Sequence, residues 1–493
     1  MTPGHPDTDW TFHGRQAELA ALSELLEARR FFFLQVSGRR RIGKTTLVME
    51  ALRRSGRDRV AYVHVPDADP AGVVLGAREH LRRSGVADLD FADLFGLAAT
   101  LGRLVRAGWV VVLDEFQAFA RKPLAPFTSA LQFEVDRLRD PGQGAVSGGL
   151  VVLGSSQTEM EALLEGRRAP LFGRTTATLQ LGHLAPSVVA TILRRHARLD
   201  GPRLLFAWTL LHGIPKYWRD AWEVGALIQD RPEALRRLFF TSTAPLAADG
   251  TSWLIEELRG RYDTLLRYLA AHPDAPRADI AAHIGETAGH SSSQVGAWLA
   301  ALEDRFRLVQ RVRPAFSSPK GRKGRYRIND NFLVAWLGAL AGPVAFAAVR
   351  PIPGLIAEAD ARLAGLEGFP LERLAAGLFA ERSRRGVGDF PLAAPVAGWW
   401  DRRGAEVDLV AERADGRALM VGTCKRNPQK LIADLGRFDG HVERLLSREP
   451  RLGELALVRV AIAPKLRPDQ RRAAAARGYR AMDLGDLTEG LLP

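Results

Sequence analysis

The segment Gly38–Thr45 constrains the fold more than any other part of the sequence. It matches the pattern G-x-x-x-x-G-K-[ST] and lies between a short apolar run at 31–36 and a stretch with helical spacing at 44–55. Its two glycines allow a tight loop whose backbone N–H groups converge on phosphate oxygens, and the helix that follows adds the positive end of its dipole. This strand–loop–helix setting predicts a phosphate-binding loop.

The residue types in this loop predict binding of ATP with Mg²⁺. Lys44 brings a point charge to the terminal phosphates, and the Thr45 hydroxyl is a ligand for Mg²⁺. The three arginines inside the loop exceed what holding phosphate requires, and we expect them to face adjoining domains or a neighbouring subunit. The residues predicted to contact the nucleotide here are Gly38, Arg39, Arg40, Arg41, Ile42, Gly43, Lys44, Thr45 and Thr46.

Two carboxylates, Asp114 and Glu115, end the apolar run at 109–115. In a nucleotide site of this kind the aspartate holds Mg²⁺, and the glutamate orients and deprotonates the attacking water. A solvated strand end is the alternative for an isolated acidic pair. The apolar run before the pair and its distance from the loop favour the catalytic interpretation, which predicts ATP hydrolysis.

Two further segments offer side chains to this site. The strand-like run at 150–156 ends in Ser155 and Ser156, followed by Gln157, and ligands of open α/β sheets lie at such strand ends. One of these side chains, with Ser155 preferred, is a candidate sensor of the γ-phosphate; a plain turn is the alternative. Arg174 is a candidate arginine finger, within the chain or across a subunit, and a surface arginine is its alternative. The predicted catalytic residues are Glu115, Lys44 and Arg174.

The chain has 493 residues, too many for one compact domain. Its composition, 46% apolar and 25% charged, is ordinary for soluble globular proteins. Apolar runs that alternate with amphipathic stretches predict a parallel sheet covered by helices on both faces. The fold class is α/β multidomain, with a P-loop ATPase core at 1–181, a helical lid at 182–255, a winged helix-turn-helix at 256–350 and a further α/β domain at 351–493.

The net charge of +13 favours an acidic partner, most often nucleic acid, although a genome that prefers arginine codons is an alternative cause. The one cysteine, Cys424, excludes an intrachain disulfide and fits a reducing cytosol. No secretory signal is visible, and the longest apolar stretch, 332–349, is broken by Gly342-Pro343 and is expected in a core. These features predict a cytoplasmic protein without a membrane segment.

The middle of the chain predicts three successive helices, at 262–272, 278–285 and 291–306, followed by a hairpin rich in cations. Such a hairpin would neutralise phosphates and give binding a steep salt dependence, so we expect nucleic acid, DNA preferred, with protein contact as the alternative. The third helix offers Ser292, Gln294 and Glu303, which do not predict sequence-specific readout. The hairpin cations are Arg311, Arg313, Lys320, Arg322, Lys323, Arg325 and Arg327.

With these motifs the chain resembles the archaeal-type ATPases, a branch of the AAA+-like and STAND-like P-loop NTPases. The resemblance covers nearly the whole chain and rests on segments at 12–19, 36–47, 111–117, 150–156, 170–174 and 213–218. It implies that Phe12, Gly14 and Arg15 help to form the base pocket. It also implies that Gly213 and Pro215 of the lid lie against the nucleotide, and that a winged helix follows.

The hairpin at 405–425 resembles the core of restriction-endonuclease-like nucleases of the PD-(D/E)xK type, which the ATPase family commonly has as its last domain. The resemblance matches Asp408 to the first acid, Lys425 to the lysine and Glu372 to the auxiliary acid, a set that surrounds Mg²⁺. Thr423 stands where the motif has its second acid. Glu406 shares a strand face with Asp408 and is the one candidate to replace that oxygen, but we favour an inactive site. Trp399–Arg403 and Arg382–Arg385 predict a basic, aromatic rim, with core tryptophans as the alternative.

Three functions therefore compete. The first is a Mg²⁺-dependent ATPase whose ATP state positions the winged helix and the nuclease-like domain on nucleic acid. The second is a signalling switch that assembles protein partners, with ATP-dependent homo-oligomerisation. The third is an ATP-regulated, metal-dependent nuclease. The basic hairpin favours the first over the second, and Thr423 counts against the third.

Overall fold

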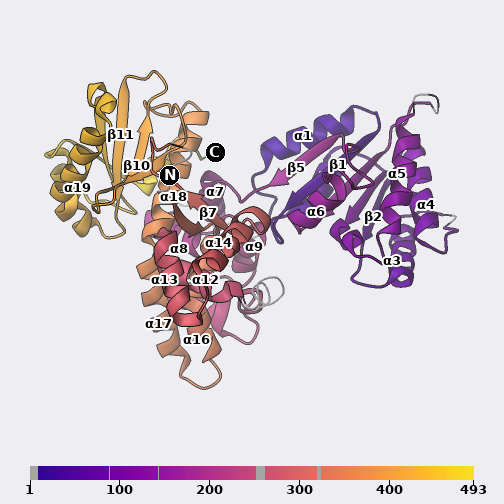
Figure 1. Cartoon of the computed structure of the whole chain (residues 1–493), viewed down its shortest axis with the longest axis horizontal. Coiled ribbons are helices and arrows are strands. Elements are labelled where there is room, and N and C mark those ends of the chain that lie inside the picture. The colour runs from indigo at the N-terminus through magenta and orange to yellow at the C-terminus, as the bar shows by residue number, and fades with distance from the viewer. Residues whose placement is uncertain are drawn as a thin grey trace. The chain divides into compact units, whose positions relative to one another are not determined.

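The computed structural model describes residues 9–87, 89–140, 142, 144–250, 261–318 and 324–492. By its contacts the chain forms two compact units (Figure 1). The first unit is Gly14–His183 with Ile214–Lys216, and the second contains the described residues of 1–13, 184–213 and 217–493. The break after His183 lies close to the predicted end of the ATPase core at 181. The boundary predicted at 255 lies outside the described residues, and the later boundaries fall within one unit and stay predictions.

The first unit is built on a five-stranded sheet of order β2-β3-β4-β1-β5 in which every pairing is parallel. The predicted parallel sheet is thus confirmed. Strands β1, β3 and β4 are buried along their whole length, as their continuous apolar runs require. The strands are β1 (Phe32–Gly38), β2 (Val60–His64), β3 (Val110–Asp114), β4 (Gly149–Gly154) and β5 (Ala177–Leu181).

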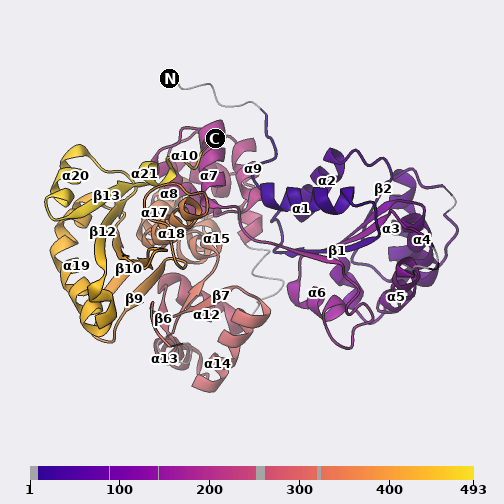
Figure 2. The ribbon, with the colours of Figure 1, turned by 90° about the horizontal axis from the view of Figure 1, so that it is seen from above.

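Helices cover both faces of this sheet, and Figure 2 shows α1 and α2 on one side of β1 with α6 on the other. Two of the helices begin at an aspartate that accepts a hydrogen bond from the first turn: Asp69 for α3 and Asp93 for α4. The helices are α1 (Gln16–Glu27), α2 (Lys44–Arg54), α3 (Pro70–Arg83), α4 (Leu94–Arg106), the short turn η1 (Phe116–Ala120), α5 (Pro126–Arg139) and α6 (Gln157–Leu164).

The second unit begins with helices, as predicted for the segment after the sheet. They are α7 (Pro186–His196), α8 (Gly201–Leu211), α9 (Pro215–Glu223), α10 (Arg231–Leu235) and η3 (Arg236–Phe240). The first two residues of α9 belong to the first unit. The chain therefore returns from the second unit to the first for three residues and leaves again.

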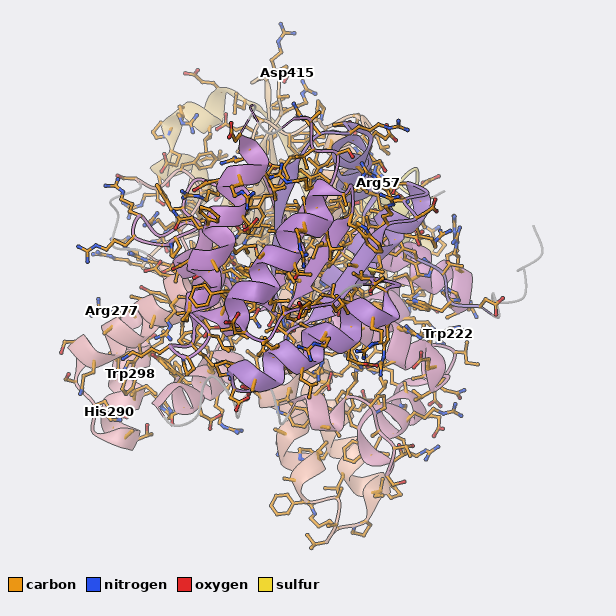
Figure 3. The ribbon with its side chains drawn as sticks, turned by 90° about the vertical axis from the view of Figure 1, so that its right-hand side faces the viewer. Arg57, Trp222, Arg277, His290, Trp298 and Asp415 are labelled. Atoms are coloured by element: carbon orange, nitrogen blue, oxygen red, sulfur yellow. The ribbon has the colours of Figure 1, made fainter. Side chains whose placement is uncertain are left out.

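The three predicted middle helices and the hairpin are present. They are α12 (Arg261–Ala271), α13 (Arg277–Ala288), α14 (Ser292–Ala300) with η4 (Ala301–Arg305), and the antiparallel strands β6 (Ala275–Pro276), β7 (Val309–Val312) and β8 (Arg325–Ile328), in the order β6-β8-β7. Ser291 and Gln294 form a capping box at the start of α14. Figure 3 labels Arg277, His290 and Trp298 of this region, and the His290 and Trp298 rings meet edge to face. Lys320, Arg322 and Lys323 lie outside the described residues.

The first half of the apolar stretch at 332–349 lies in a core, as predicted, whereas the second half is mostly exposed or half-buried, including Phe346 and Val349. It forms α15 (Asn331–Ala335), η5 (Trp336–Leu340) and α16 (Ala341–Ala345), and Phe332, Trp336 and Pro343 are buried. Within the described part of the chain, no helix combines the length and apolar character needed to cross a membrane. Two longer helices follow, α17 (Ile352–Leu366) and α18 (Gly368–Arg384).

The chain ends in a mixed five-stranded sheet of order β13-β12-β11-β10-β9. The strands β9 (Ala397–Trp400), β10 (Glu406–Glu412) and β11 (Ala418–Cys424) are antiparallel, whereas β12 (Ala456–Ala463) and β13 (Tyr479–Asp483) run parallel to β11. The predicted hairpin with Gly416 in its turn is present, with a φ of 68° at that glycine. The helices are α19 (Pro428–Arg448), η6 (Pro450–Glu454), α20 (Pro468–Ala475) and α21 (Leu484–Thr488).

The predicted basic, aromatic rim of this domain is wrong in part. Trp399 is buried in the core of the sheet, and Trp400 is buried as well. Arg382 donates to the carbonyl oxygens of Asp486, Leu487 and Glu489, and Arg385 donates to that of Leu491. These arginines hold the C-terminal segment against α18. Their guanidinium groups therefore donate to carbonyl oxygens of this chain. Cys424 is buried.

Candidate functional site

The predicted phosphate-binding loop joins β1 to α2 at the carboxyl edge of the parallel sheet. Gly38 has a φ of 152°, and a Cβ there would lie 2.7 Å from the main-chain oxygen of Leu181. Gly43 has a φ of 88°. Both positions therefore require glycine. The buried Ile42 side chain fixes the loop from beneath, whereas Arg40 and Thr46 are exposed.

Lys44 turns back into this loop. Its Nζ donates to the carbonyl oxygens of Gly38, at 2.9 Å, and Arg39, at 3.1 Å. Burial lowers the pKa of Lys44 to about 8, an effect partly offset by the carboxylates of Glu115 and Asp114. A buried ammonium at the centre of converging backbone groups is suited to an anionic ligand that replaces its lost hydration.

The two predicted Mg²⁺ ligands meet, although they are far apart in sequence. Thr45 Oγ1 donates to Asp114 Oδ2 at 2.6 Å. Tyr62, which sequence reasoning missed, donates its hydroxyl to the same oxygen at 2.8 Å. Burial and then the Asp114 charge raise the pKa of Tyr62, so it remains a donor at neutral pH. A hydroxyl and a carboxylate beside a phosphate-binding lysine are the donor set that Mg²⁺ prefers, so these residues fit the ion.

Glu115, the predicted base, is held by two side chains. Its φ of 57° is left-handed, and its Oε2 accepts from Ser155 Oγ at 2.9 Å and from Gln117 Nε2. Gln117 also donates to Ser155 Oγ at 3.1 Å, and its Oε1 accepts from Ser155 N at 3.2 Å. Ser155 thus lies beside the proposed base, and its role as a sensor of the γ-phosphate stays a prediction. The sequence analysis did not predict a role for Gln117. Its position two residues after Glu115 was the one feature of the sequence that could have indicated this contact.

Of the residues that the resemblance assigns to the base pocket and lid, three lie in the first unit and two in the second. Arg15 is buried, and its Nη2 donates to the carbonyl oxygens of Ile42, at 3.3 Å, and Gly182, at 2.6 Å. A Cβ on Gly43 would lie 3.7 Å from Pro215 Cγ, so Pro215 lies beside the loop. Gly14, with a φ of 71°, precedes Arg15. Phe12 and Gly213 belong to the second unit, and their roles stay predictions.

Arg174 does not lie at the nucleotide site of its own chain, which corrects one half of that prediction. It precedes β5, and the nearby Thr176 N donates to the carbonyl oxygen of Phe33 at the start of β1. Because β1 and β5 are parallel, Arg174 lies at the sheet edge opposite Gly38. Its guanidinium makes two hydrogen bonds to Asp136, at 2.7 and 2.9 Å. A role across a subunit boundary stays a prediction.

A second candidate site lies within the second unit, in a cavity of about 480 Å³. It is lined by α18, β9, β10 and the β6-β8-β7 sheet, and it brings together acids predicted in the C-terminal domain with arginines of the basic hairpin. Asp274 of the middle segment lines the same cavity and was missed. The charged lining residues are Asp274, Glu372, Glu406, Asp408, Arg311, Arg313, Arg327 and Arg373.

The predicted acids of this cavity are engaged by protein donors. Asp408 Oδ2 accepts from Thr423 Oγ1 at 2.9 Å and from Cys424 N at 2.8 Å, with Lys425 Nζ at 3.6 Å. Burial, and then Asp408, raises the pKa of Glu372. Among the residues that the structure describes, Glu372, Glu406 and Asp408 do not bring one oxygen each within 4.8 Å of the others. This conformation therefore does not support the alternative in which Glu406 replaces the missing metal ligand, and the inactive site that we favour stays a prediction.

Two of the predicted nucleic-acid contacts bind acids of this cavity: Arg327 lines it, and Arg325 contacts Glu406 and Trp400 of its lining. Arg325 Nη1 donates to Glu406 Oε1 at 2.7 Å, and its guanidinium lies 4.5 Å from the ring centroid of Trp400. Arg327 Nε lies 3.7 Å from Asp274 Oδ1. The two arginine side chains are 22% and 25% exposed. They face acids of this chain and are largely withdrawn from solvent.

No family model matches the chain. A curated relative, an uncharacterized protein of Methanocaldococcus jannaschii, is 24% identical over 441 residues, which span 86% of this chain and 91% of the relative. The Walker-type ATPase PABY2304 of Pyrococcus abyssi has a similar structure, with a TM-score of 0.51 and 16% identity over 66% of this chain and 96% of that one. The ORC2 protein of Aeropyrum pernix, in its ADPNP–ADP complexes, gives 0.49 and 16% over 74% and 97%.

The similarity to the Pyrococcus abyssi ATPase shows that the chain has the fold of a Walker-type P-loop ATPase. At 16% identity it carries the fold alone. It agrees with the parallel sheet and with the loop between β1 and α2. The sequence expectation of a P-loop core is thereby confirmed at the level of the fold.

Proposed function

We propose that this protein is a Mg²⁺-dependent ATPase. The observation that carries the proposal is the meeting of Thr45 with Asp114 at 2.6 Å, next to Lys44 and Glu115. Lys44 and the loop N–H groups would hold the phosphates, and Thr45 and Asp114 would hold Mg²⁺. The ion would neutralise charge that develops on the transferred phosphoryl group. Glu115 would accept a proton from the attacking water, with Ser155 and Gln117 fixing its orientation.

Two substitutions test this proposal separately for binding and for chemistry. Lys44→Ala should weaken ATP binding, measured by calorimetry with Mg²⁺ present. Glu115→Gln should bind ATP with the parental affinity but turn it over about 10²–10⁴-fold more slowly, because it removes the base and leaves the loop intact. Turnover by Glu115→Gln at the parental rate would show that the base is another group.

We also propose that the ATP state governs contact with nucleic acid through the middle segment. The order of three helices and an antiparallel hairpin agrees with a winged helix-turn-helix, and the net charge of +13 favours a polyanion. The C-terminal sheet would be the nuclease-like domain that acts together with the middle segment. Thr423 occupies the position of a carboxylate and donates to Asp408, which argues against cutting.

The test is ATP hydrolysis with and without a DNA duplex at low salt, together with a mobility shift. Stimulation by DNA and a complex that weakens as salt rises would support the proposal. Absence of any complex with intact protein would reject it in favour of a switch that assembles protein partners. Metal-dependent cutting that Asp408→Ala abolishes would instead establish an active nuclease.

A further inference from the structure

The basic hairpin is attached to the edge of the C-terminal sheet. After β7 the chain runs beside β9, the edge strand, and Ala315 N donates to the carbonyl oxygen of Gly398 at 2.8 Å. The next residue, Phe316, packs against the core of the C-terminal domain, where the Arg451 guanidinium lies 5.0 Å from its ring centroid. Residues 315 and 316 therefore join the hairpin to the sheet through backbone and apolar contacts.

The returning strand, β8, adds charge contacts across the cavity. Arg325 binds Glu406 of β10 and covers the Trp400 ring of β9, and Arg327 faces Asp274. At the end of β8, the carbonyl oxygens of Ile328 and Asn329 accept hydrogen bonds from Arg373 of α18, at 3.2 and 2.7 Å. We name the contacts of residues 315, 316 and 325 with β9, β10 and the C-terminal core the hairpin–sheet contact.

The hairpin–sheet contact uses a cation that nucleic acid would need. A guanidinium that donates to a carboxylate has part of its charge neutralised and fewer free N–H groups to offer a phosphate. Glu406 would in addition repel a phosphate brought next to Arg325. Arg325 therefore binds a phosphate less strongly while it is bound to Glu406.

The contact is also of a kind that a polyanion can displace. The Arg325–Glu406 pair is partly exposed, with 22% and 48% of the two side chains accessible, and exposed ion pairs are individually weak. A nucleic-acid backbone offers many phosphates to the same cations and gains further from counterion release. The free energies of the Arg325–Glu406 pair and of an Arg325–phosphate contact are therefore similar. Binding of nucleic acid can then break the pair.

We propose that the hairpin–sheet contact is an autoinhibitory contact: nucleic acid takes Arg325 from Glu406, moves the hairpin off the sheet edge, and opens the cavity lined by Glu406 and Asp408 in the same step. This inference rests on the proposed function, because it assumes that the hairpin is the surface that meets nucleic acid. It adds the competitor for that surface, which is the chain's own Glu406.

A reversible disulfide tests the proposal directly. Ala315→Cys with Gly398→Cys places two thiols at the hydrogen-bonded positions, and a Cβ on Gly398 would lie 3.6 Å from its nearest neighbours, the main-chain oxygen of Asp408 and the Trp400 ring. The native Cys424 is buried and does not compete. Binding of a fluorescein-labelled DNA duplex is measured by anisotropy at low salt, with the double variant oxidised and then reduced, and with each single variant as a control.

We expect the oxidised double variant to bind the duplex about tenfold more weakly than the reduced one, since the cation at Arg325 stays occupied. The single variants should not respond to reduction. Equal affinity of the oxidised and reduced forms would overturn the autoinhibitory contact while leaving the proposed nucleic-acid function in place. A wild-type protein that binds no duplex would overturn both.

A second variant avoids the disulfide altogether. Glu406→Gln removes the competitor and should tighten duplex binding by about threefold or more, because it returns one cation to the hairpin. Glu443→Gln, an exposed position on α19, makes the same change in net charge and is the matched control. If both variants bind alike, the gain comes from net charge alone and the proposal fails.

Discussion

At the scale of single residues, the proposed base is positioned by hydrogen bonds to one of its two oxygens. Oε2 of Glu115 accepts from Gln117 and Ser155, whereas Oε1 accepts from no residue that the structure describes. Oε1 is then the oxygen with capacity to take a proton from water. Gly154 makes room for this arrangement, since a Cβ there would lie 3.1 Å from Gln117 Oε1 and 2.2 Å from Met160 Sδ.

Gln117 is therefore predicted to act as a positioning residue. Gln117→Ala should lower kcat for ATP about 10–100-fold with little change in KM, since it misdirects the base and leaves phosphate contacts intact. Gln117→Glu should move the acidic limb of the pH–rate profile to higher pH, because it places a second carboxylate beside the base. The control is Gln310→Ala, an exposed glutamine of β7. An unshifted profile in Gln117→Glu would assign Gln117 a structural role only.

Gly38 carries a separate prediction for the loop. Gly38→Ala should abolish measurable nucleotide binding, because the added Cβ would meet the Leu181 main-chain oxygen at 2.7 Å in a left-handed conformation that alanine resists. Gly56→Ala also has a positive φ, of 63°, but no atom within 4 Å of its Cβ. It should cost some stability and leave nucleotide affinity unchanged. Calorimetric titration of both variants separates the clash from the backbone preference.

At the scale of elements, the parallel sheet was predictable because its central strands, β1, β3 and β4, are largely apolar runs separated by amphipathic helices. The loop after β1 followed from residue spacing, and so did Asp114 and Glu115 at the end of β3. Tyr62 could not be found in this way, because its contact with Asp114 depends on the order of β2 and β3 in the sheet. The pairing of Arg325 with Glu406 was equally hidden, since it joins residues 81 apart in sequence.

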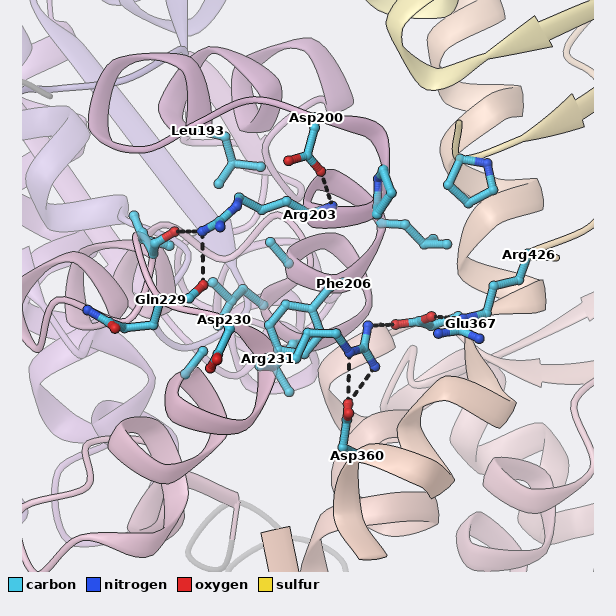
Figure 4. A pocket seen from close by; sticks show the side chains of 18 of the residues that line it. Leu193, Asp200, Arg203, Phe206, Gln229, Asp230, Arg231, Asp360, Glu367 and Arg426 are labelled. Atoms are coloured by element: carbon cyan, nitrogen blue, oxygen red, sulfur yellow. Dashed lines mark hydrogen bonds and ion pairs between the residues drawn. The ribbon is translucent and has the colours of Figure 1, made fainter. Parts of the chain in front are cut away.

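The helices after the first unit are joined to the C-terminal elements by a buried carboxylate (Figure 4). Glu367, which is 1% exposed, accepts from Arg231 of α10 and from Arg426, which follows β11. Arg231 also binds Asp360 of α17 at 2.7 Å and covers the Phe206 ring of α8. These residues line a cavity of about 680 Å³, in which Glu367 joins Arg231 to Arg426 and Arg231 in turn contacts α17 and α8.

Loss of this carboxylate should be costly, because it leaves two arginines facing each other. Glu367→Gln is expected to destabilise the second unit by about 3 kcal/mol, the usual cost of breaking a buried ion pair. Asp389→Asn is the control, since Asp389 is 74% exposed in its pair with Arg480 and should cost ~1 kcal/mol or less. Calorimetric unfolding of both variants measures the difference. Similar unfolding temperatures would show that the network adds little stability.

At the scale of the whole molecule, the proposed nucleotide site is connected to the second unit through a short segment of the chain. Residues Ile214–Lys216 belong to the first unit, where Pro215 lies beside Gly43, while the residues on both sides belong to the second. Within the second unit, Ser187 of α7 is tied to Glu381 of α18, which accepts from Ser187 N at 3.0 Å and from its hydroxyl. Helix α7 is thus connected to α18, one of the elements that line the cavity of the second unit.

If that connection transmits the nucleotide state, Glu381→Gln should separate basal hydrolysis from its response to DNA. Glu381 is buried in the second unit, and its hydrogen-bond and ion-pair partners among the described residues are Ser187 and Arg385, so the rate without DNA should stay within about twofold of the parent. Stimulation by DNA should fall, because a neutral amide no longer holds Ser187 and Arg385 together. Glu443→Gln serves again as the control. Full stimulation in a variant with a lowered unfolding temperature would mean that Glu381 stabilises the unit without transmitting the signal.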